Sequence, residues 1–280
     1  MRVYKSIKLL VNEIDSIKRR RETIGLVPTM GYLHEGHLSL IRKARKDTDC
    51  VVVSIFVNPI QFGSGEDLKK YPRNLNRDLR FCRANGVDIV FFPTPKSMYS
   101  NGFSSYVNVE GLAGRLCGAS RPGHFKGVTT VVTKLFNIVD PDIAYFGQKD
   151  AQQAIVIKKM VEDLNMPVKI KILPIVREKD GLAMSSRNIY LDNGQRSQAL
   201  SLYRSLRLAK DLYEKGEKDP KKIIKGMRRL ILKEKDARIN YIFIVDLKEL
   251  KNLNRISEKT LVAVAVKIGR TRLIDNVILN

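Results

Sequence analysis

The stretch PTMGYLHEGH, residues 28–37, decides the fold that we expect for this chain of 280 residues. It follows a short apolar run with the character of a strand and leads into a run with helical periodicity. Free backbone N–H groups at the start of such a helix point at one spot, where a polyphosphate can bind. His34 and His37 are three residues apart and can both face that spot. Gly31 and Gly36 give a ligand close access to the backbone.

Strand-like and helix-like runs alternate outward from this turn. The strand-like runs are 24–27, 51–57, 87–92, 143–146 and 168–175, and the helix-like runs are 38–46, 75–84, 128–138 and 151–164. This alternation predicts an α/β fold, a Rossmann-like parallel sheet with helices on both faces. Ligands collect at the carboxyl ends of parallel strands, and the polar motifs NPIQF and FGQKD also follow strand-like runs.

The pattern changes at residue 177. A polar stretch, REKDGLAMSSRN, is followed by helix-like runs at 193–215 and 220–235 and by short strands at 240–245, 261–267 and 271–278. We therefore expect two domains, residues 1–176 and a smaller C-terminal α+β domain of residues 177–280.

Composition narrows the class of protein. The three cysteines form no CxxC pair, so we expect neither disulfides nor a zinc ribbon. The charged N-terminus is not a signal peptide, and no apolar run approaches the roughly 20 residues that span a bilayer, so we expect a cytoplasmic protein with no membrane contact. The net charge of +22 fits nucleic-acid binding, anionic substrates or a lysine-rich surface. The basic residues are dispersed and no aromatic platform accompanies them, which favours a solvated surface and no nucleic-acid partner.

Several polar residues suit a phosphorylated or hydroxylated ligand. Lys149 can neutralise phosphate charge, and Asp150 can either accept from ribose hydroxyls or cap the next helix. Arg187 offers a fork for phosphate oxygens beside Ser185 and Ser186, although the stretch MSSRN read alone could be a turn. The carboxamides of Gln61 and Gln153, which both donate and accept, suit a hydroxy acid or an exposed surface.

Two signatures resemble those of the nucleotidyltransferase superfamily. PTMGYLHEGH resembles its HIGH motif, and Met184 to Arg187 are similar to its KMSKS loop, with Arg187 where the synthetase pattern ends in Lys-Ser. The segments FVNPIQFG, EDLKKYPR, RPGHFKGV, FGQKDAQQ and VREKDGLAMSSRN, in this order, resemble the pantoate–beta-alanine ligases, or pantothenate synthetases.

This resemblance implies an enzyme that joins (R)-pantoate to β-alanine. Pantoate would first attack the α-phosphorus of ATP, releasing pyrophosphate, and β-alanine would then displace AMP from the pantoyl adenylate. ATP and Mg²⁺ would be required, and a homodimer would form through the first domain while the C-terminal domain acts as a lid. We expect the stretch 180–188 to be a mobile loop that closes over ATP.

The resemblance also assigns residues. His37 would be the proton donor, Gln61 and Gln153 would bind pantoate, and Gln61 would border β-alanine. No residue is assigned as a metal ligand, because Mg²⁺ on phosphates keeps most of its waters, and Asp78 would support the site from behind. The expected ATP-binding residues are Met30, Gly31, Tyr32, Leu33, His34, Glu35, Gly36, His37, Gly147, Gln148, Lys149, Asp150, Val176, Met184, Ser185, Ser186 and Arg187.

Alternative classes remain open at this point. A class I aminoacyl-tRNA synthetase shares both signatures, but about a hundred residues after the second one leave little room for an anticodon-binding module. A nonenzymatic RNA-binding protein would explain the charge but not the motifs. HEGH departs from the HExxH zinc pattern and the third histidine, His124, is 87 residues beyond His37, so a zinc pair is disfavoured.

Overall fold

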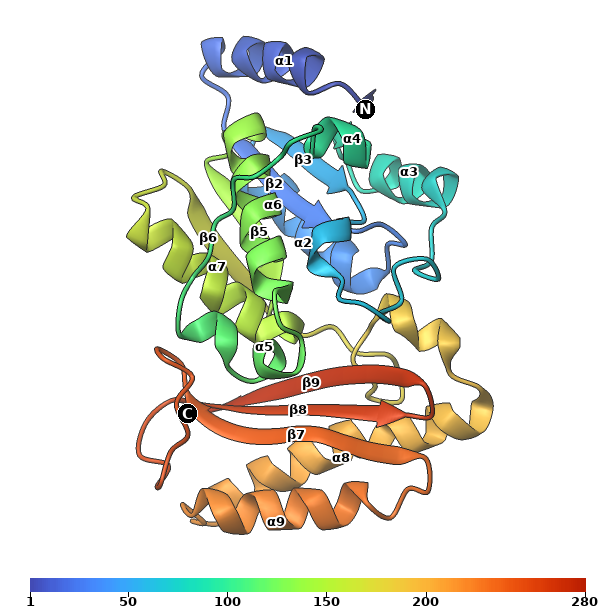
Figure 1. The fold of residues 1–280 in the computed structure, drawn as a ribbon, viewed down its shortest axis with the longest axis vertical. Helices are drawn as coiled ribbons and strands as arrows, with labels where there is room; N and C mark the ends of the chain where they lie inside the picture. The colour runs from blue at the N-terminus through green and yellow to red at the C-terminus, as the bar shows by residue number, and fades with distance from the viewer.

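The structure, a computed structural model, describes residues 1–280. Figure 1 shows two modules, with the N-terminal residues in a helix-covered sheet above and the C-terminal residues in a three-stranded sheet below. No helix has both the length and the apolar character needed to cross a membrane. The predicted α/β fold with a smaller α+β part is confirmed.

The larger sheet has six parallel strands. They are β1 (Arg2–Tyr4), β2 (Ile24–Thr29), β3 (Cys50–Ile55), β4 (Ile89–Phe91), β5 (Ile143–Gly147) and β6 (Lys169–Leu173). Their order is β1-β4-β3-β2-β5-β6, and every neighbouring pair is parallel. The chain builds outward from β2 in one direction and then returns to add β5 on its other side. The carboxyl ends of β2 and β5 therefore flank the switch point where ligands bind in such sheets.

Helices cover both faces of this sheet, as predicted. The longer ones are α1 (Ile7–Arg19), α2 (Glu35–Asp47), α3 (Leu75–Ala84), α6 (His124–Val139) and α7 (Ala151–Asp163), and the short ones are α4 (Pro95–Met98), α5 (Cys117–Ser120), η1 (Pro59–Gln61), η2 (Leu112–Gly114) and η3 (Gln148–Asp150). In β3, Val52 packs in the core with α1, α6 and α7, whereas Val51 and Val53 pack in the core with α2. A strand buried on both faces reads as a continuous apolar run, which is how this one was recognised.

The first two elements were not predicted. β1 is a three-residue edge strand, too short to carry a periodic signal. Helix α1 does carry one, because Leu10, Ile14 and Ile17 recur at helical spacing and are its buried residues. Ser6 caps it by accepting from the Leu9 N–H. The helix was not predicted because the many charged residues between these apolar positions made the segment look uniformly polar.

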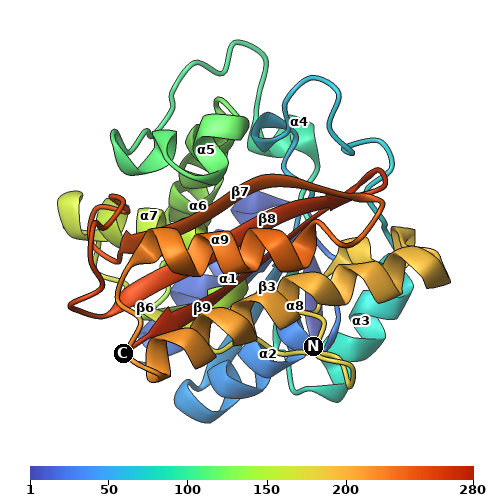
Figure 2. The ribbon, with the colours of Figure 1, turned by 90° about the horizontal axis from the view of Figure 1, so that it is seen from below.

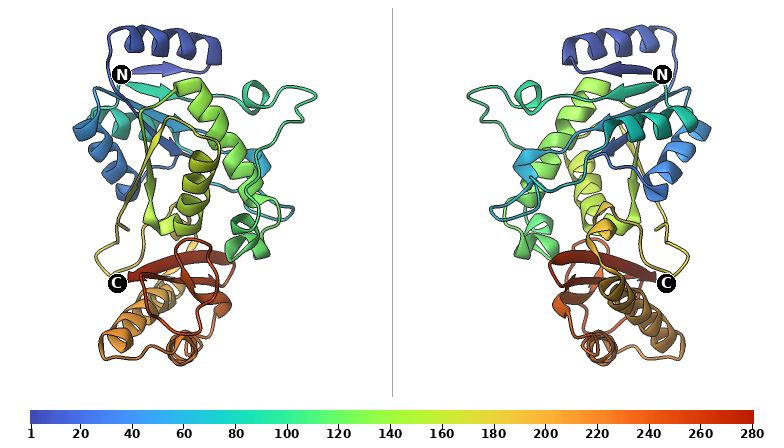
Figure 3. Two further views of the ribbon diagram at one scale, coloured as in Figure 1. Left: turned by 90° about the vertical axis from the view of Figure 1, so that its left-hand side faces the viewer. Right: turned by 90° about the vertical axis from the view of Figure 1, so that its right-hand side faces the viewer.

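The C-terminal module places two helices on one face of an antiparallel sheet (Figures 2 and 3). It comprises η4 (Ser186–Tyr190), α8 (Asn193–Glu214), α9 (Pro220–Ile231), β7 (Ala237–Asp246), β8 (Thr260–Ile268) and β9 (Thr271–Leu279). The strand order is β7-β8-β9, and α8 and α9 share a separate apolar core with one face. The other face lies against the larger module (Figure 1), with Leu261 and Ala263 of β8 in that module's core.

Candidate active site

A cavity opens at the carboxyl ends of β2 and β5 and extends to the start of η4. The predicted site residues that line it are Met30, His34, Gly36, His37, Gln61, Gly147, Lys149, Asp150, Gln153, Val176, Met184, Ser185, Ser186 and Arg187. The structure therefore brings together residues from four separate motifs. Lys149 and Arg187 are its two full cations, and Asp150 is the only carboxylate in the lining.

The turn after β2 is braced from behind by a buried carboxylate. Gly31 and Tyr32 have positive φ angles of 81° and 50°. Asp78 of α3 is 1% exposed and accepts from the backbone N–H groups of Tyr32 and Leu33, each at 2.8 Å. A Cβ on Gly31 would come within 3.0 Å of an Asp78 carboxylate oxygen. The positive φ values and these hydrogen bonds fix the path of the turn toward α2.

Five of the predicted ATP-binding residues do not line the cavity: Gly31, Tyr32, Leu33, Glu35 and Gln148. Gly31 and Tyr32 form the turn, and the Leu33 side chain is fully buried in the core with α2. Glu35 pairs with Arg42 on the protein surface. Gln148 turns toward the C-terminal module, where its Nε2 donates to Asn276 Oδ1 at 3.2 Å. Sequence spacing places a backbone at a ligand but does not say where each side chain points.

The two histidines of the turn lie against each other at the start of α2. Their ring centroids are 4.1 Å apart, and His37 Nδ1 accepts from the backbone N–H of His34 at 3.3 Å. This hydrogen bond leaves Nε2 of a neutral His37 ring to carry the proton. A Cβ on Gly36 would come within 2.9 Å of the His34 ring, so the glycine makes room for that ring.

Both rings are neutral at pH 7. Burial, and then the nearby charge of Lys149, lower the pKa of His37 from 6.5 to about 4. Burial, and then His37, Lys149 and Arg77, lower the pKa of His34 to about 2. His37 can therefore donate a hydrogen bond from Nε2 without carrying a charge.

The MSSR segment, residues 184–187, also lines the cavity. The guanidinium of Arg187 makes a bidentate ion pair with Asp67, with Nε–Oδ2 and Nη2–Oδ1 distances of 2.8 Å. Ser186 is buried and its hydroxyl donates to the Tyr32 carbonyl at 3.4 Å. The segment thus touches the turn after β2 directly.

A hydrogen-bonded row of side chains orients Gln61. Tyr99 donates to Asn58 Oδ1 at 2.7 Å, and Asn58 Nδ2 donates to Gln61 Oε1 at 3.0 Å. The Nε2 of Gln61 is directed to the Met30 sulfur at 3.2 Å. Gln61 therefore presents donors to the cavity rather than its oxygen.

The other carboxamide, Gln153, lies in the first turn of α7 and lines the same cavity. Its neighbour Gln152 instead binds backbone groups, accepting from Cys117 and donating to Leu112 and Arg115. Of these two adjacent glutamines, one supports the fold and one faces the cavity.

Sequence reasoning missed part of the lining. One wall is an apolar face of α6, formed by Val128, Val131, Val132 and Leu135, and a signal for it existed in their helical spacing. Asn58 and Tyr71 also line the cavity. Both lie inside motifs quoted above, but nothing in one sequence distinguishes them from structural residues.

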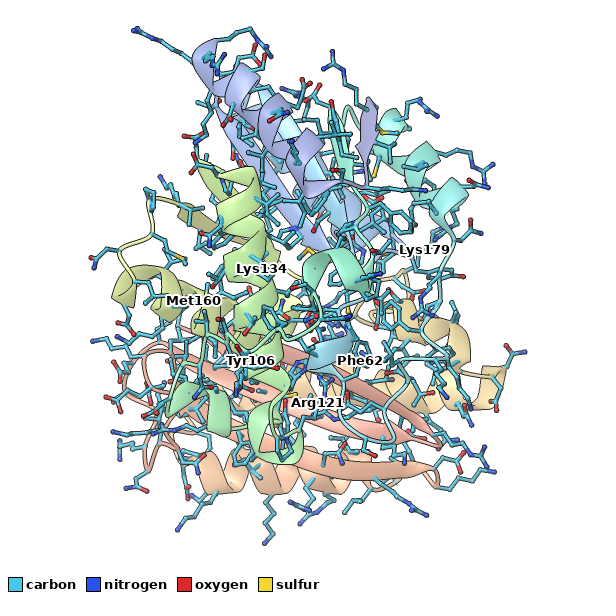
Figure 4. All side chains as sticks on the ribbon, turned by 45° about the horizontal axis from the view of Figure 1, so that its top comes forward. Phe62, Tyr106, Arg121, Lys134, Met160 and Lys179 are labelled. Atoms are coloured by element: carbon cyan, nitrogen blue, oxygen red, sulfur yellow. The ribbon has the colours of Figure 1, made fainter.

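His124, the first residue of α6, is buried and does not line this cavity. Its Nδ1 pairs with the Gln61 carbonyl at 2.8 Å and its Nε2 with Arg121 at 2.9 Å. Burial, and then Arg121, lower its pKa to about 4. Arg121, labelled in Figure 4, lies where the modules meet and forms an ion pair with Glu66. No group of three or more His, Cys, Asp or Glu side chains is arranged to hold a metal ion.

Comparison with known proteins relates the whole chain to one family. Residues 2–278 match the family model described as "Pantoate-beta-alanine ligase". The chain is 58% identical to the pantothenate synthetase of Acetivibrio thermocellus over 278 residues, covering 99% of both proteins. It is 55% identical to that of Moorella thermoacetica over 279 residues, covering 100% of this chain and 99% of the relative.

Solved structures agree. Pantothenate synthetase from Thermus thermophilus has a TM-score of 0.94 at 42% identity, with 99% of both chains covered. Pantoate-beta-alanine ligase from Francisella tularensis, complexed with beta-gamma ATP and beta-alanine, has a TM-score of 0.83 at 36% identity, covering 99% of this chain and 97% of that one.

Proposed function

Because the chain belongs to the pantoate-beta-alanine ligase family and is an enzyme of that kind, we propose that its cavity forms and consumes a pantoyl adenylate. The observation that carries the proposal is that His37, Lys149 and Arg187 line one cavity together with an apolar face of α6 and two carboxamides, Gln61 and Gln153. The Francisella relative, complexed with beta-gamma ATP and beta-alanine, supports ATP and β-alanine as the other two substrates.

In the first step, a pantoate carboxylate oxygen attacks the α-phosphorus of ATP. The bond from that phosphorus to the bridging oxygen breaks, and pyrophosphate leaves. Negative charge develops on the nonbridging and leaving oxygens, so fixed donors contribute more than a protein nucleophile would. His37 would donate from Nε2, and Lys149 and Arg187 would supply full positive charge.

The α6 wall and the two carboxamides of the cavity suit a branched hydroxy acid. The valines and leucine of α6 would pack against the two methyl groups of pantoate. Gln61 presents its Nε2 donors, which suit a carboxylate or hydroxyl oxygen. Gln153, on helix α7, would bind a second oxygen of pantoate.

In the second step, the amine of β-alanine attacks the acyl carbon of the adenylate. The acyl–phosphate bond breaks, AMP leaves with the electron pair, and the nitrogen releases a proton to solvent. Gln61, next to the acyl group of pantoate, would border this amine. No covalent enzyme intermediate is required.

Magnesium would accompany the ATP phosphates and neutralise part of their charge. A phosphate-bound Mg²⁺ keeps several waters and uses few protein ligands. The residues present fit this arrangement, because the lining offers Asp150 as a single carboxylate that could receive a coordinated water.

A pyrophosphate-release assay tests the function. Release that requires both ATP and pantoate, with AMP and pantothenate appearing when β-alanine is added, is the expected result. The same assay with amino acids and tRNA tests the aminoacyl-tRNA synthetase alternative. Release with amino acids and none with pantoate would overturn the proposal.

Three further assignments complete it. We place the boundary between the domains at residues 176 and 177, after β6 and before the bridge from Arg177 to Ala183. We propose a cytoplasmic enzyme, supported by three free and buried cysteines. We also propose a homodimer through the first domain, for which light scattering of the purified chain should give twice 31.9 kDa.

A further inference from the structure

We propose that Asn276, on strand β9 of the C-terminal module, is a positioning residue that holds Lys149 at the ATP phosphates. The inference rests on the proposed function, because it takes from there the role of Lys149. Asn276 itself reaches no substrate through this arrangement. It acts on the turn that carries the lysine.

The carboxamide of Asn276 is committed to that turn on both sides. Its Nδ2 donates to the carbonyl oxygens of Gln148 at 2.9 Å and of Lys149 at 3.0 Å. Its Oδ1 accepts from Gln148 Nε2 at 3.2 Å. Backbone carbonyls only accept hydrogen bonds, so the amide orientation is fixed. Asn276 is 3% exposed, and water therefore competes little for these contacts.

The turn lacks an anchor of its own. The 3-10 helix η3 (Gln148–Asp150) and helix α7 both begin without a hydrogen bond from a capping side chain. A capping side chain would accept from the first backbone N–H groups, and none does so here. Asn276 holds the turn differently, by donating to its carbonyl oxygens, and it comes from another module, 127 residues later than Lys149.

The neighbouring residue on β9 holds the second phosphate-facing segment. Asp275 is 3% exposed and makes a bidentate ion pair with Arg177, at 2.6 and 3.0 Å. Arg177 also donates to the Gly181 carbonyl at 3.1 Å, in the stretch that leads to Met184. Strand β9 therefore contacts both the turn at 148–150 and the stretch at 177–184. We infer that ATP binding depends on the position of the C-terminal module relative to the first module.

The direct test is Asn276→Ala, with substrate parameters measured separately. Loss of these hydrogen bonds keeps the charge of Lys149 but no longer fixes the backbone that positions it. We therefore expect the Kd for ATP to rise about tenfold. The KM for pantoate should change less than twofold, because the side chain of Asn276 forms hydrogen bonds with Gln148 and Lys149 and with neither Gln61 nor Gln153. Asn276→Asp keeps the shape of the side chain but places a carboxylate against the two carbonyl oxygens. This variant should bind ATP at least as weakly as Asn276→Ala.

Gln198→Ala is the matched control. Gln198 is also a buried carboxamide with two hydrogen bonds, donating to Asp236 Oδ2 at 2.8 Å and accepting from the Asp236 N–H at 2.9 Å. All of these groups belong to the C-terminal module. This variant should lose stability as Asn276→Ala does and keep the ATP affinity of the wild type. Equal weakening of ATP binding by both variants would overturn the proposal.

A double-mutant cycle separates positioning from general destabilisation. If Asn276 acts through Lys149, adding Asn276→Ala to Lys149→Ala should weaken ATP binding by less than twofold. A full tenfold effect in that background would contradict the inference. Should Asn276→Ala fail to fold, Gln148→Ala removes one of the three hydrogen bonds and should weaken ATP binding by about twofold to threefold; an unchanged Kd would count against the proposal.

The outcomes also separate this inference from the proposed function. Pantoate-dependent pyrophosphate release by the wild type, with unaltered ATP affinity in Asn276→Ala, would refute the inference alone. No such release by the wild type, with ATP affinity unaltered in Lys149→Ala, would refute the function and with it the inference.

Discussion

Two segments line the proposed ATP site and are held in different ways. The turn at 28–37 is fixed within its own module by positive φ angles and by two hydrogen bonds to the buried Asp78. The segment at 177–190 is held by two ion pairs, one to the first module between Arg187 and Asp67 and one within the C-terminal module between Arg177 and Asp275. The first segment has its conformation fixed before any ligand binds. In the second segment, Arg187 can exchange Asp67 for a phosphate oxygen when ATP binds.

The second segment forms a loop, as its polar sequence predicts, and its closure over ATP stays a prediction. A tight turn at Gly181 is closed by a hydrogen bond from the Glu178 N–H to the Leu182 carbonyl at 2.8 Å. Met184 donates to the Val176 carbonyl at 3.0 Å, and the Leu182 side chain is buried in the C-terminal core. Any closure must therefore move Ser185 and the residues after it, or carry the C-terminal module along.

The largest effect is expected in the fixed turn. His37→Ala should slow adenylate formation by about 10² to 10³-fold, the usual consequence of losing one donor to developing charge. The fold should survive, because the ring is at the start of α2 and lines the cavity rather than the core. Pyrophosphate release near the wild-type rate, with a native circular dichroism spectrum, would show that His37 is not the donor.

The two carboxylates that support the segments should differ in their effect on stability. Asp78→Ala leaves the N–H groups of Tyr32 and Leu33 without acceptors, which should lower the free energy of unfolding by about 2 to 4 kcal/mol. Asp67→Ala removes a partly exposed ion pair and should cost less than about 1 kcal/mol. Urea unfolding of both variants measures the contrast. Equal losses would mean that the second segment is as rigidly held as the first.

This contrast also marks how far one sequence leads. The parallel sheet follows from apolar runs such as 51–57, because burial on both faces leaves a continuous signal. The two segments at 28–37 and 177–190 both carry motifs with a chemical rationale. The contacts of Asp67, Asp78 and Asn276 lie between segments far apart in the chain, and side-chain direction at a turn, as for Leu33, depends on packing that periodicity does not encode.

Acid should weaken the fixed turn through His37. The folded-state pKa of His37 is about 4, below its ordinary 6.5, so the unfolded chain binds its proton more readily. The stabilisation is therefore present above pH 6.5 and is lost as the pH falls toward 4. Between pH 7.5 and 5.0 we expect a loss of about 1 to 2 kcal/mol from this ring.

Comparison with His37→Gln isolates that contribution. The urea midpoint of the wild type should fall further between the two pH values than that of the variant. Burial raises the pKa of Asp78, which acts in the opposite direction but equally in both proteins. Parallel losses in wild type and variant would show that the ring is not held neutral by the fold.

The smallest effect concerns the second segment and is seen only with ligand. At an ATP concentration ten times the Kd, binding adds at most about 1.4 kcal/mol, so amide exchange can slow by about tenfold. We expect this gain at Ser185, Ser186 and Arg187, where phosphate would replace or share the Asp67 contact, and little gain in the turn at 28–37, which is already fixed. Arg187→Ala should abolish the gain and slow pyrophosphate release. Hydrogen exchange with and without ATP and magnesium measures the protection of both segments. Protection gained in the turn at 28–37 but not at 185–187 would show that the first segment, and not the second, closes on the nucleotide.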